Sequence, residues 1–300
     1  MTNQPRRLAD NEKWLGRVMI APAIVYIVAL VGFPFFLALY YSVSNITVGS
    51  TETTFLGLDN FRHLLNNRTF LRALRNTFVF AFVSQALVLV LAKALALSLL
   101  RDFRGKWVVR LLILLPWVAP ISLGSIGWLW ILDSVYSVIN WSCRALGIFG
   151  PMTWPIWLGQ PTLAMASIIT VHVWRLLPLA TVILLGGLTS IPQDIHDAAA
   201  VDGAGFWRHN FQITIPLVLP IMLVAVLFGV VFAFTDMIVI YVLTRGGPYD
   251  TTQVLASLAF FTGIDGGDLG TGAAIALFLF PVLAASAILL LRLARRTEVT

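Results

Sequence analysis

Residues 217–243, "LVLPIMLVAVLFGVVFAFTDMIVIYVL", decide the fold class of this chain, because they carry a single charged side chain, Asp236. A helix needs about 20 mostly apolar residues to cross the hydrocarbon core of a bilayer, and this stretch exceeds that length. The composition of the 300-residue chain agrees: 59% of residues are hydrophobic, 11% are charged, and the mean hydropathy is +0.88. Soluble domains carry roughly 25% charged residues. Most of the chain is therefore expected to lie in lipid.

Five further stretches outside this segment are also long and apolar. Together with 217–243 they predict an all-α, polytopic integral membrane protein with six transmembrane helices. A helix suits the membrane because all its backbone N–H and C=O groups form hydrogen bonds within the segment, as the water-free interior of a bilayer requires. The first of these stretches in the chain, residues 18–43, is too long for the apolar part of a signal peptide, and no small-residue cleavage site follows it. The other five spans are expected at residues 18–43, 77–100, 108–132, 162–187 and 271–293.

The distribution of Lys and Arg predicts the orientation of these spans. With the N-terminus inside, the inner segments hold twelve Lys and Arg residues and the outer segments hold six. Because positive residues favour the cytoplasmic side, both termini are expected in the cytoplasm, as segments 1–17 and 294–300. Residues 44–73 then form an outer segment, and residues 188–216 face the cytoplasm. The net charge of +6 is spread around the spans, which favours this topological role over binding of nucleic acid.

A polar segment, "DAAAVDGAGFWRHNFQITIP" at residues 197–216, interrupts the apolar chain. Ser190 is expected to cap a short helix, with Gln193 completing a capping box. Gly203 suits a left-handed turn at the end of that helix. Asp202 is then expected to cap a second helix that stops at Pro216. The segment is thus predicted to be two short helices joined at Gly203.

The surface of the first short helix allows two readings. Three consecutive alanines at 198–200 make it slim, and a slim helix with a carboxylate beside it suits a groove on another protein. The alternative is a connector that lies on the membrane, with Phe206, Trp207 and Phe211 in the interface. The residues alone leave both readings open.

Sites for chemistry are missing from the sequence. It contains no GxxxxGK[ST] phosphate loop, no HExxH helix and no GxSxG turn. Its one cysteine, Cys143, excludes an internal disulfide, and its four histidines share no metal-ligand spacing. No catalytic residue and no metal site are predicted, and uphill transport would draw its energy from an ion gradient or from another subunit.

Charged residues inside the spans are few. Lys93 lies close enough to the inner end of its span for its side chain to reach the interface. Arg175 lies near the middle of the fourth span and Asp236 near the outer end of the fifth. Buried charges in membranes pair with each other or line a hydrophilic pathway, and both readings remain open for Arg175 and Asp236.

The spacing around residue 197 resembles a known signature. Asp197, Ala198 and Ala199 are followed after three residues by Gly203 and then by Ile213 and Pro216. This pattern closely resembles the EAA loop of permeases of ATP-binding-cassette (ABC) importers, with Asp197 in place of the usual Glu and Ile215 in place of the usual Leu.

Further motifs extend the resemblance over nearly the whole chain and identify it as similar to the carbohydrate-type permeases of the maltose and glycerol-phosphate importer group. The stretches that carry it are "FLGLDNFRHLL" (55–65), "FLRALRNTFVF" (70–80), "LLPWVAPISLGSIGWLWIL" (114–132), "VWRLLPLATVILLGGLTSIP" (173–192) and "FAFTDMIVIYVLTRGGPYDTT" (232–252). The resemblance implies a type I importer permease core at 74–293 with a cytoplasmic coupling loop at 188–216.

The family implies how the work is divided among subunits. Two ATPase subunits bind ATP and Mg²⁺ and dock on the cytoplasmic face, while this chain binds no cofactor itself. A second homologous permease completes the pathway, and a periplasmic or lipid-anchored binding protein delivers a carbohydrate. The expected location is the cytoplasmic (inner) membrane of a bacterium or archaeon. The chain is expected to be a transport subunit and not an enzyme.

The resemblance also assigns roles to residues. Coupling to the ATPase is implied for Asp197, Ala198, Ala199, Asp202, Gly203, Ile213 and Pro216, and the substrate pathway for Trp174, Arg175, Thr235 and Asp236. Three alternatives remain open: a permease for another solute such as a polyamine or phosphate, an ion-coupled secondary transporter that uses Arg175 and Asp236, and a membrane scaffold without transport activity.

Overall fold

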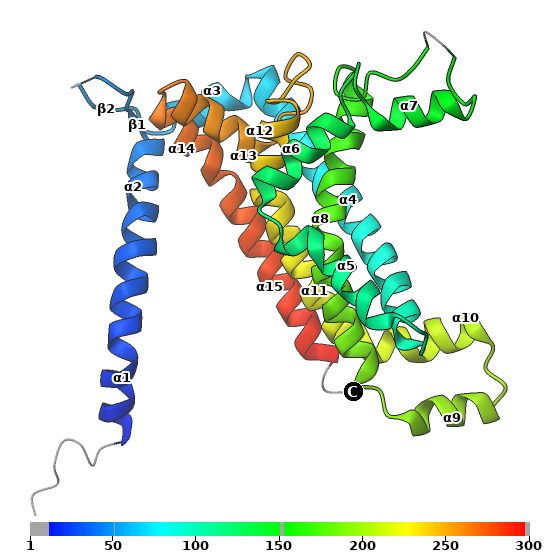
Figure 1. The fold of residues 1–300 in the computed structure, drawn as a ribbon. Helices are drawn as coiled ribbons and strands as arrows, with labels where there is room; N and C mark the ends of the chain where they lie inside the picture. Colours follow the sequence, from blue (N-terminus) through cyan, green and yellow to red (C-terminus); the bar gives the residue numbers. More distant parts are fainter. Residues whose placement is uncertain (1–11, 51, 151–152, 298–300) are drawn as a thin grey trace, which may run out of the picture.

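The chain is almost entirely helical in the computed structural model, which describes residues 12–50, 52–150 and 153–297 (Figure 1). The two described strands, β1 (Ser44–Asn45) and β2 (Thr54–Phe55), form a short antiparallel pair after the first span. Five helices are long and apolar enough to cross a membrane, or six if one bent pair counts as one span. This confirms the predicted all-α fold with six spans. Residues 1–11 and 298–300 of the expected terminal segments lie outside the described residues.

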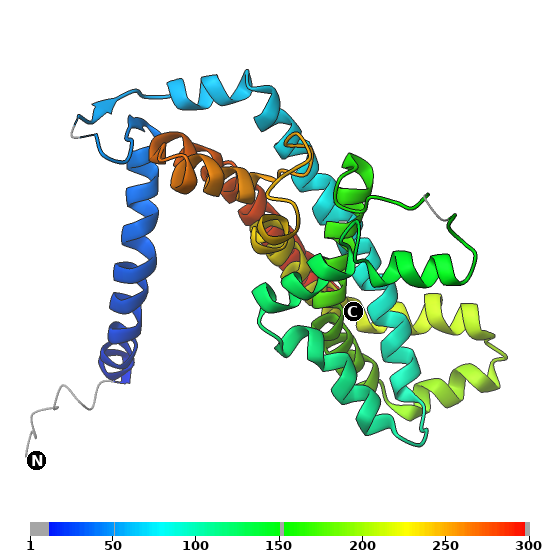
Figure 2. The same ribbon diagram turned by 45° about the horizontal axis from the view of Figure 1, so that its top comes forward.

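The first span stands apart from the other helices. It consists of α1 (Glu12–Ile27), one π-helical turn, η2 (Val28–Gly32), and α2 (Phe33–Ser42). Both ribbon views show α1 separated from the bundle (Figures 1 and 2). The first span contacts the bundle where α2 packs against α14. Its apolar window has a mean hydropathy of 2.4 and none of it is buried. Such a helix must be covered by lipid or by another protein.

Four long helical segments form the core of the bundle. α8 is the most buried, with 56% of its apolar window inside the protein, because α4, α5 and α11 pack around it. α15 packs on the side of α11. The segments are α4 (Arg68–Leu100), α8 (Pro161–Thr189), α11 (Ile215–Thr235) and the pair α14 (Leu269–Leu277) and α15 (Leu279–Thr297).

The third span differs from the continuous helix expected at 108–132. It is two helices, α5 (Lys106–Val118) and α6 (Ile121–Ile131), with a 98° bend between them. Pro120 lies at the bend, and a proline ring disfavours helical geometry in the residue before it. Ala119 accordingly has extended backbone angles, φ −64° and ψ 139°.

The fifth span also breaks earlier than expected. α11 ends at Thr235, Asp236 is extended, and α12 (Ile238–Leu243) continues in a new direction. The helix expected at 217–243 is therefore interrupted at its one charged residue. The chain then reaches α14 through α13 (Leu255–Phe260) and the π-helical turn η4 (Phe261–Asp265).

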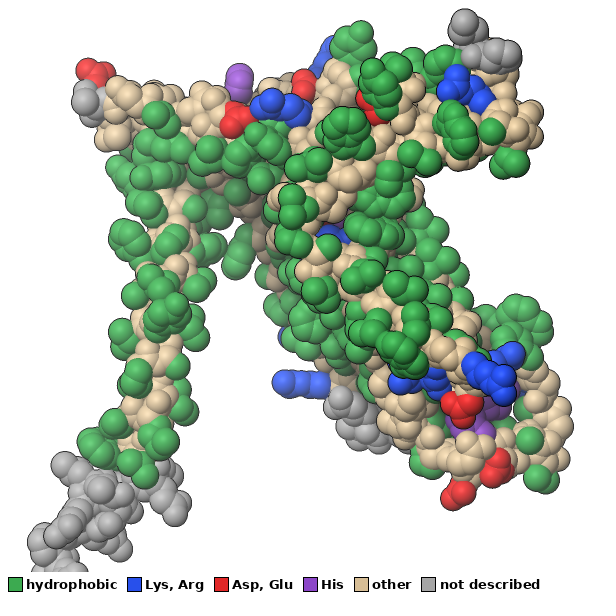
Figure 3. All heavy atoms as spheres, viewed as in Figure 1, with side chains coloured by type: hydrophobic (Ala, Val, Ile, Leu, Met, Phe, Trp, Pro, Cys, Tyr) green, Lys and Arg blue, Asp and Glu red, His purple; other side chains and the backbone are tan. Residues whose placement is uncertain are grey.

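Polar elements lie at the two ends of the bundle. At one end lie α3 (Asp59–Leu65) and α7 (Val138–Ala145), and at the other lies the segment after α8 (Figure 1). Most charged side chains on the visible face gather at these ends, and a wide hydrophobic band separates them (Figure 3). The start of α1 and the end of α15 lie at the same end as the segment after α8 (Figure 1). The side of the membrane on which the two termini lie stays a prediction.

Candidate functional site

The polar segment between α8 and α11 folds back on itself at the end of the bundle (Figure 1). α9 (Gln193–Val201) leads outward, and the short α10 (Phe206–Arg208) and the π-helical turn η3 (His209–Thr214) lead back into α11. The segment is therefore two short helical arms: α9 follows α8 after a short break at residues 190–192, and η3 runs directly into α11.

The turn between the arms is a Schellman motif. The backbone N–H of Ala204 donates to the carbonyl of Ala199 at 2.9 Å, and the N–H of Gly203 donates to Ala200 at 3.1 Å. Gly203 has φ +68°, which glycine adopts without the steric cost that a side chain brings. The left-handed turn predicted at Gly203 is confirmed, and it fixes the angle between the two arms.

The predicted caps of both arms are wrong. Ser190 is not part of a capping box, because α9 begins after Pro192 and the Ser190 hydroxyl donates to the carbonyl of Gly187 at 2.7 Å. Gln193 instead donates its amide to Asp197 Oδ1 at 3.0 Å. Asp202 ends α9 as its C-terminal cap, and Gly205 precedes α10. The spacing of the residues could not decide these caps, because Ser190 lies between the end of α8 and the start of α9, and Asp202 lies between the end of α9 and the start of α10.

The first arm presents a slim surface. Asp197, Ala198 and Ala200 are exposed, Val201 is 87% exposed, and Ala199 alone of the alanine run is buried. The space-filling view shows Asp or Glu, Lys or Arg, and His side chains together at this corner of the molecule (Figure 3). The proposed coupling residues thus lie on an accessible helix that a partner protein can reach.

Contacts with the bundle hold the second arm. The Lys93 ammonium of α4 lies 5.7 Å from the centre of the Phe211 ring, which suits a cation–π contact near the C-terminal end of α4. Ile213 is half-buried in η3, and Pro216 lies in the first turn of α11, which follows η3 without a break. These contacts connect the loop firmly to the start of α11.

A pair of histidines joins the two arms. His196 Nδ1 of α9 lies 2.9 Å from His209 Nε2 of η3, and their rings are 5.0 Å apart. The Thr214 hydroxyl lies 3.4 Å from His209 Nδ1 and 3.2 Å from the carbonyl of His209. We call His196 and His209 the histidine clasp. The sequence offered no signal for it beyond the presence of an imidazole on each arm.

Removing the hydrogen bond of the clasp should weaken transport without preventing folding. His209→Phe keeps an aromatic ring against His196 but loses the bond, which is worth about 1 kcal/mol, so uptake is expected to fall about fivefold. The measurement is initial uptake per inserted protein. His63→Phe, at an exposed histidine of α3, is the matched control. Equal uptake in both variants would show that the clasp does not transmit motion.

A second cluster lies deep within the spans, where α11 breaks. His172 Nδ1 donates to Asp236 Oδ2 at 2.6 Å, and both side chains are buried. Asp236 Oδ1 accepts from the backbone N–H of Val239 at 3.3 Å, which caps α12. His172 also packs edge-on against the Phe80 ring of α4. The cluster therefore joins α8 to the junction of α11 and α12.

Arg175 completes this cluster from one turn further along α8. Its Nη1 lies 3.7 Å from Asp236 Oδ2, so the pair considered from the sequence is present. Its guanidinium carbon lies 5.9 Å from the ring centres of both Trp117 and Phe232. The Arg175 side chain is 21% exposed, so part of the guanidinium remains accessible. The Asp236 side chain, in contrast, is almost completely buried.

The other two residues expected on the substrate pathway are near this cluster. The Trp174 ring packs edge-on against Trp128 of α6, with ring centres 5.7 Å apart, and it lies close to Gly124, where a side chain would meet it. Thr235 is exposed at the end of α11, and its hydroxyl donates to the carbonyl of Val231 at 2.8 Å. All four residues are thus near one another, although a pathway role for them remains a prediction.

Sequence reasoning missed His172. Its signal was its position three residues before Arg175, which places the two side chains on one side of a helix. Among the described residues, no group of three or more His, Cys, Asp or Glu side chains could hold a metal ion.

Comparison with known proteins gives consistent relatives. Residues 86–299 match the family model described as binding-protein-dependent transport system inner membrane component. The trehalose/maltose transport system permease protein of Thermococcus litoralis is 32% identical over 98% of both chains. The sulfoquinovosyl glycerol transport system permease protein of Agrobacterium fabrum is 29% identical over 92% of this chain and 88% of its own.

The fold is also similar to a solved structure. A chain of the bacterial alginate ABC transporter, solved in complex with an alginate pentasaccharide-bound periplasmic protein, has a TM-score of 0.80 at 21% identity and covers 97% of this chain and 98% of its own. Together with the family match over residues 86–299 and a relative of nearly equal length, this establishes that the chain belongs to the family of binding-protein-dependent transport system inner membrane components.

Proposed function

We propose that this chain is one of two permease subunits of an ABC importer and that the complex takes up a sugar or sugar derivative. The observation that carries the proposal is the exposed arm α9, which lies between two core helices and ends at the fixed turn of Gly203. A push on α9 reaches α8 through the short connection at residues 190–192 and reaches α11 through η3, which is continuous with it. The names of the relatives, which include permeases for trehalose/maltose and for sulfoquinovosyl glycerol, support the substrate class.

In this proposal the energy comes from two ATPase subunits on the cytoplasmic face of a bacterial or archaeal membrane. Those subunits use ATP and Mg²⁺, and α9 docks into a cleft on one of them through Asp197, Ala198, Ala199 and the Gly203 turn. Closure of the ATPases moves α9 and, through Ile213 and Pro216, the start of α11. The pathway then alternates between an outward state and an inward state.

The solute enters from an external binding protein, periplasmic or lipid-anchored, and passes between this chain and a second homologous permease. Trp174 offers a ring for packing against a sugar face, Arg175 offers N–H donors, and the Thr235 hydroxyl oxygen can accept. Asp236 acts through Arg175, which it holds in place. The alternatives are a polyamine or phosphate as the solute and an ion-coupled carrier that uses Arg175 and Asp236.

Reconstituted vesicles test this function. The chain is co-expressed with a candidate second permease, ATPase and binding protein, and the purified complex is placed in liposomes with ATP inside. We expect uptake of a labelled saccharide only with ATP and binding protein present, and no dependence on an ion gradient. Uptake by this chain without an ATPase, abolished by an ionophore, would establish the ion-coupled alternative instead.

A further inference from the structure

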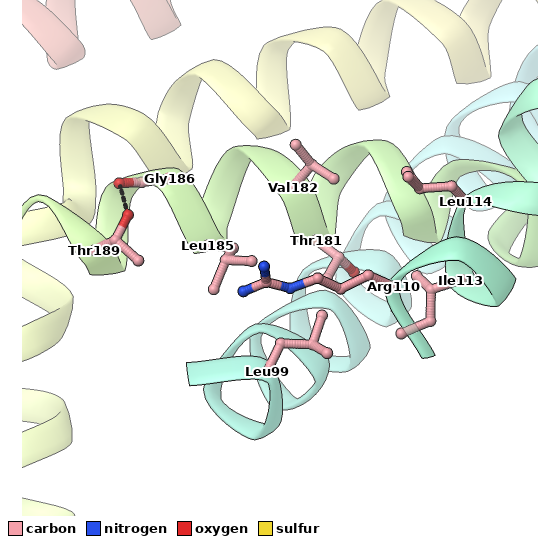
Figure 4. Close-up of a pocket in the computed structure, with 9 residues that line it drawn as sticks. All are labelled: Leu99, Arg110, Ile113, Leu114, Thr181, Val182, Leu185, Gly186 and Thr189. Carbon is pink, nitrogen blue, oxygen red and sulfur yellow. Dashed lines mark hydrogen bonds between the residues drawn. The ribbon is translucent and has the colours of Figure 1, made fainter. Parts of the chain in front are cut away.

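A cavity of 390 Å³ lies between α4, α5 and α8, on the side of the bundle near the coupling arms. Arg110 of α5 extends across it, with its guanidinium between Leu185 of α8 and Leu99 of α4 (Figure 4). Thr181 of α8 lies beside the Arg110 side chain (Figure 4), and Val182 of the same helix also lines the cavity. The cavity is therefore a mainly apolar hollow with one charged group.

The cavity lies on the face of α8 that carries Trp174 and Arg175. Thr181 and Leu185 follow Trp174 by 7 and 11 residues. Val182 and Gly186 follow Arg175 by the same intervals. Residues spaced in this way lie above one another on a helix. Seven residues correspond to about 10 Å along the axis, so the cavity begins roughly two turns inward of Arg175.

On α5 as well, the residues that line the cavity lie next to a residue that contacts Arg175. Trp117, whose ring lies beside the Arg175 guanidinium, follows Ile113 and Leu114 of the cavity by one turn. Val182 and Gly186 are also exposed, although α8 is the most buried span. The surface around Trp174 and Arg175 thus extends along α5 and α8 into the cavity without a change of face.

Arg110 is an exposed residue whose guanidinium is open to water or to a ligand. In the described part of the chain no residue accepts a hydrogen bond from it or forms an ion pair with it. A guanidinium has five N–H donors, which suit hydroxyl, carboxylate or phosphate oxygens. The apolar side chains around it suit the C–H faces of a sugar ring. A saccharide therefore fits both surfaces of the cavity.

We propose that this cavity is an inner subsite of the solute path and that Arg110 binds oxygen atoms of the saccharide there after it leaves Trp174 and Arg175. This inference rests on the proposed import function. The cavity lies on the same face of α8 as Arg175, and a charged residue at mid-depth in the membrane, such as Arg175, does not face lipid. A saccharide is therefore favoured over an anionic lipid as the occupant of the cavity. A lipid phosphate on Arg110 is the alternative outcome that the experiment distinguishes.

Thiol labelling tests the subsite directly, because Cys143 is the one cysteine of the chain and can be removed as Cys143→Ser. In that background Val182→Cys places a thiol in the cavity wall. The complete complex is prepared in inside-out vesicles, and a charged methanethiosulfonate reagent is added with or without the saccharide that the wild type takes up, trehalose being tried first. We expect the saccharide to slow labelling about tenfold.

The charge of Arg110 is tested in the same vesicles. Arg110→Gln should abolish the protection by saccharide and lower uptake about tenfold, while ATP hydrolysis stimulated by the binding protein is retained. Arg104→Gln, at an exposed arginine of the same inner segment, is the matched control and should keep the protection by saccharide and the wild-type uptake.

Three results would overturn the inference, and each differs from failure of the proposed function. Normal uptake by the wild type with no protection of the Val182→Cys thiol would show that solute does not occupy the cavity. Labelling that is slowed by added anionic phospholipid and not by saccharide would assign the cavity to lipid. Equal uptake by Arg110→Gln and Arg104→Gln would remove Arg110 from the path. The absence of any ATP-driven uptake by the wild type would instead contradict the proposed function.

Discussion

Gly203→Pro is expected to abolish ATP-driven uptake, by at least about a hundredfold, while the chain still inserts into the membrane. Proline fixes φ near −65°, and Gly203 has φ +68°. Proline also removes the N–H that Gly203 donates to Ala200. The Schellman turn then opens, and α9 no longer keeps its angle to α10. The measurement is uptake in reconstituted vesicles, together with ATP hydrolysis by the same complex.

Alanine substitutions at Gly203 and Gly205 separate the effect of a positive φ from the effect of adding a side chain to the loop. A side-chain carbon added at Gly203 would meet no atom within 4 Å, so Gly203→Ala adds only the strain of a positive φ, about 1–2 kcal/mol. We expect a partial loss of uptake, about tenfold. Gly205→Ala is the matched control, because Gly205 has φ −66° and also has open space. Full uptake by Gly203→Pro would contradict the assignment of this turn to coupling.

Asp236→Ala is expected to destabilise the folded chain by about 3–5 kcal/mol, the cost of breaking a buried charge pair from one side. The substitution removes the acceptor of the His172 Nδ1–H, the counter-charge of Arg175 and the cap of α12 together. Thermal unfolding of the complex in detergent measures the effect. Asp102→Ala is the control, since its ion pair with Lys106 is exposed and should contribute little.

Two further variants apportion the loss at Asp236. Asp236→Asn loses the charge and one of the two acceptor oxygens but keeps an oxygen that can accept from His172, so its melting temperature should lie between those of the wild type and Asp236→Ala. Adding Arg175→Gln to Asp236→Asn removes the unpaired charge and should recover part of the stability. If Asp236→Ala unfolds at the wild-type temperature, the cluster does not hold α8 to the junction of α11 and α12.

The loop and the buried cluster occupy opposite parts of the same two helices. From His172, near the middle of α8, the helix continues to Thr189, close to α9, and α11 runs from η3 to Thr235, next to Asp236. Motion of the loop therefore reaches both helices, and the His172–Asp236 contact holds the middle of α8 to the far end of α11. Under the proposed function, this link would make α8 and α11 move as one unit and would carry Arg175 with them.

The sequence predicted the features that depend on short-range patterns. Long apolar stretches predicted the spans because each helix must satisfy its own backbone in lipid. The spacing of Asp197, Ala198, Ala199 and Gly203 predicted a helix that ends in a left-handed turn, since only local backbone geometry is involved. The pairing of Arg175 with Asp236 was considered because buried charges in membranes require partners.

Other features depend on contacts between residues far apart in the chain. The His172–Asp236 bond joins residues 64 positions apart, and the histidine clasp forms only because the turn brings His196 back to His209. The cavity at Arg110 exists only where α4, α5 and α8 meet. The sequence by itself determined the lipid-spanning helices and the turn at Gly203, because those follow from local hydrophobicity and backbone preference. Only the tertiary structure decided which polar side chains meet, because helix packing sets those distances.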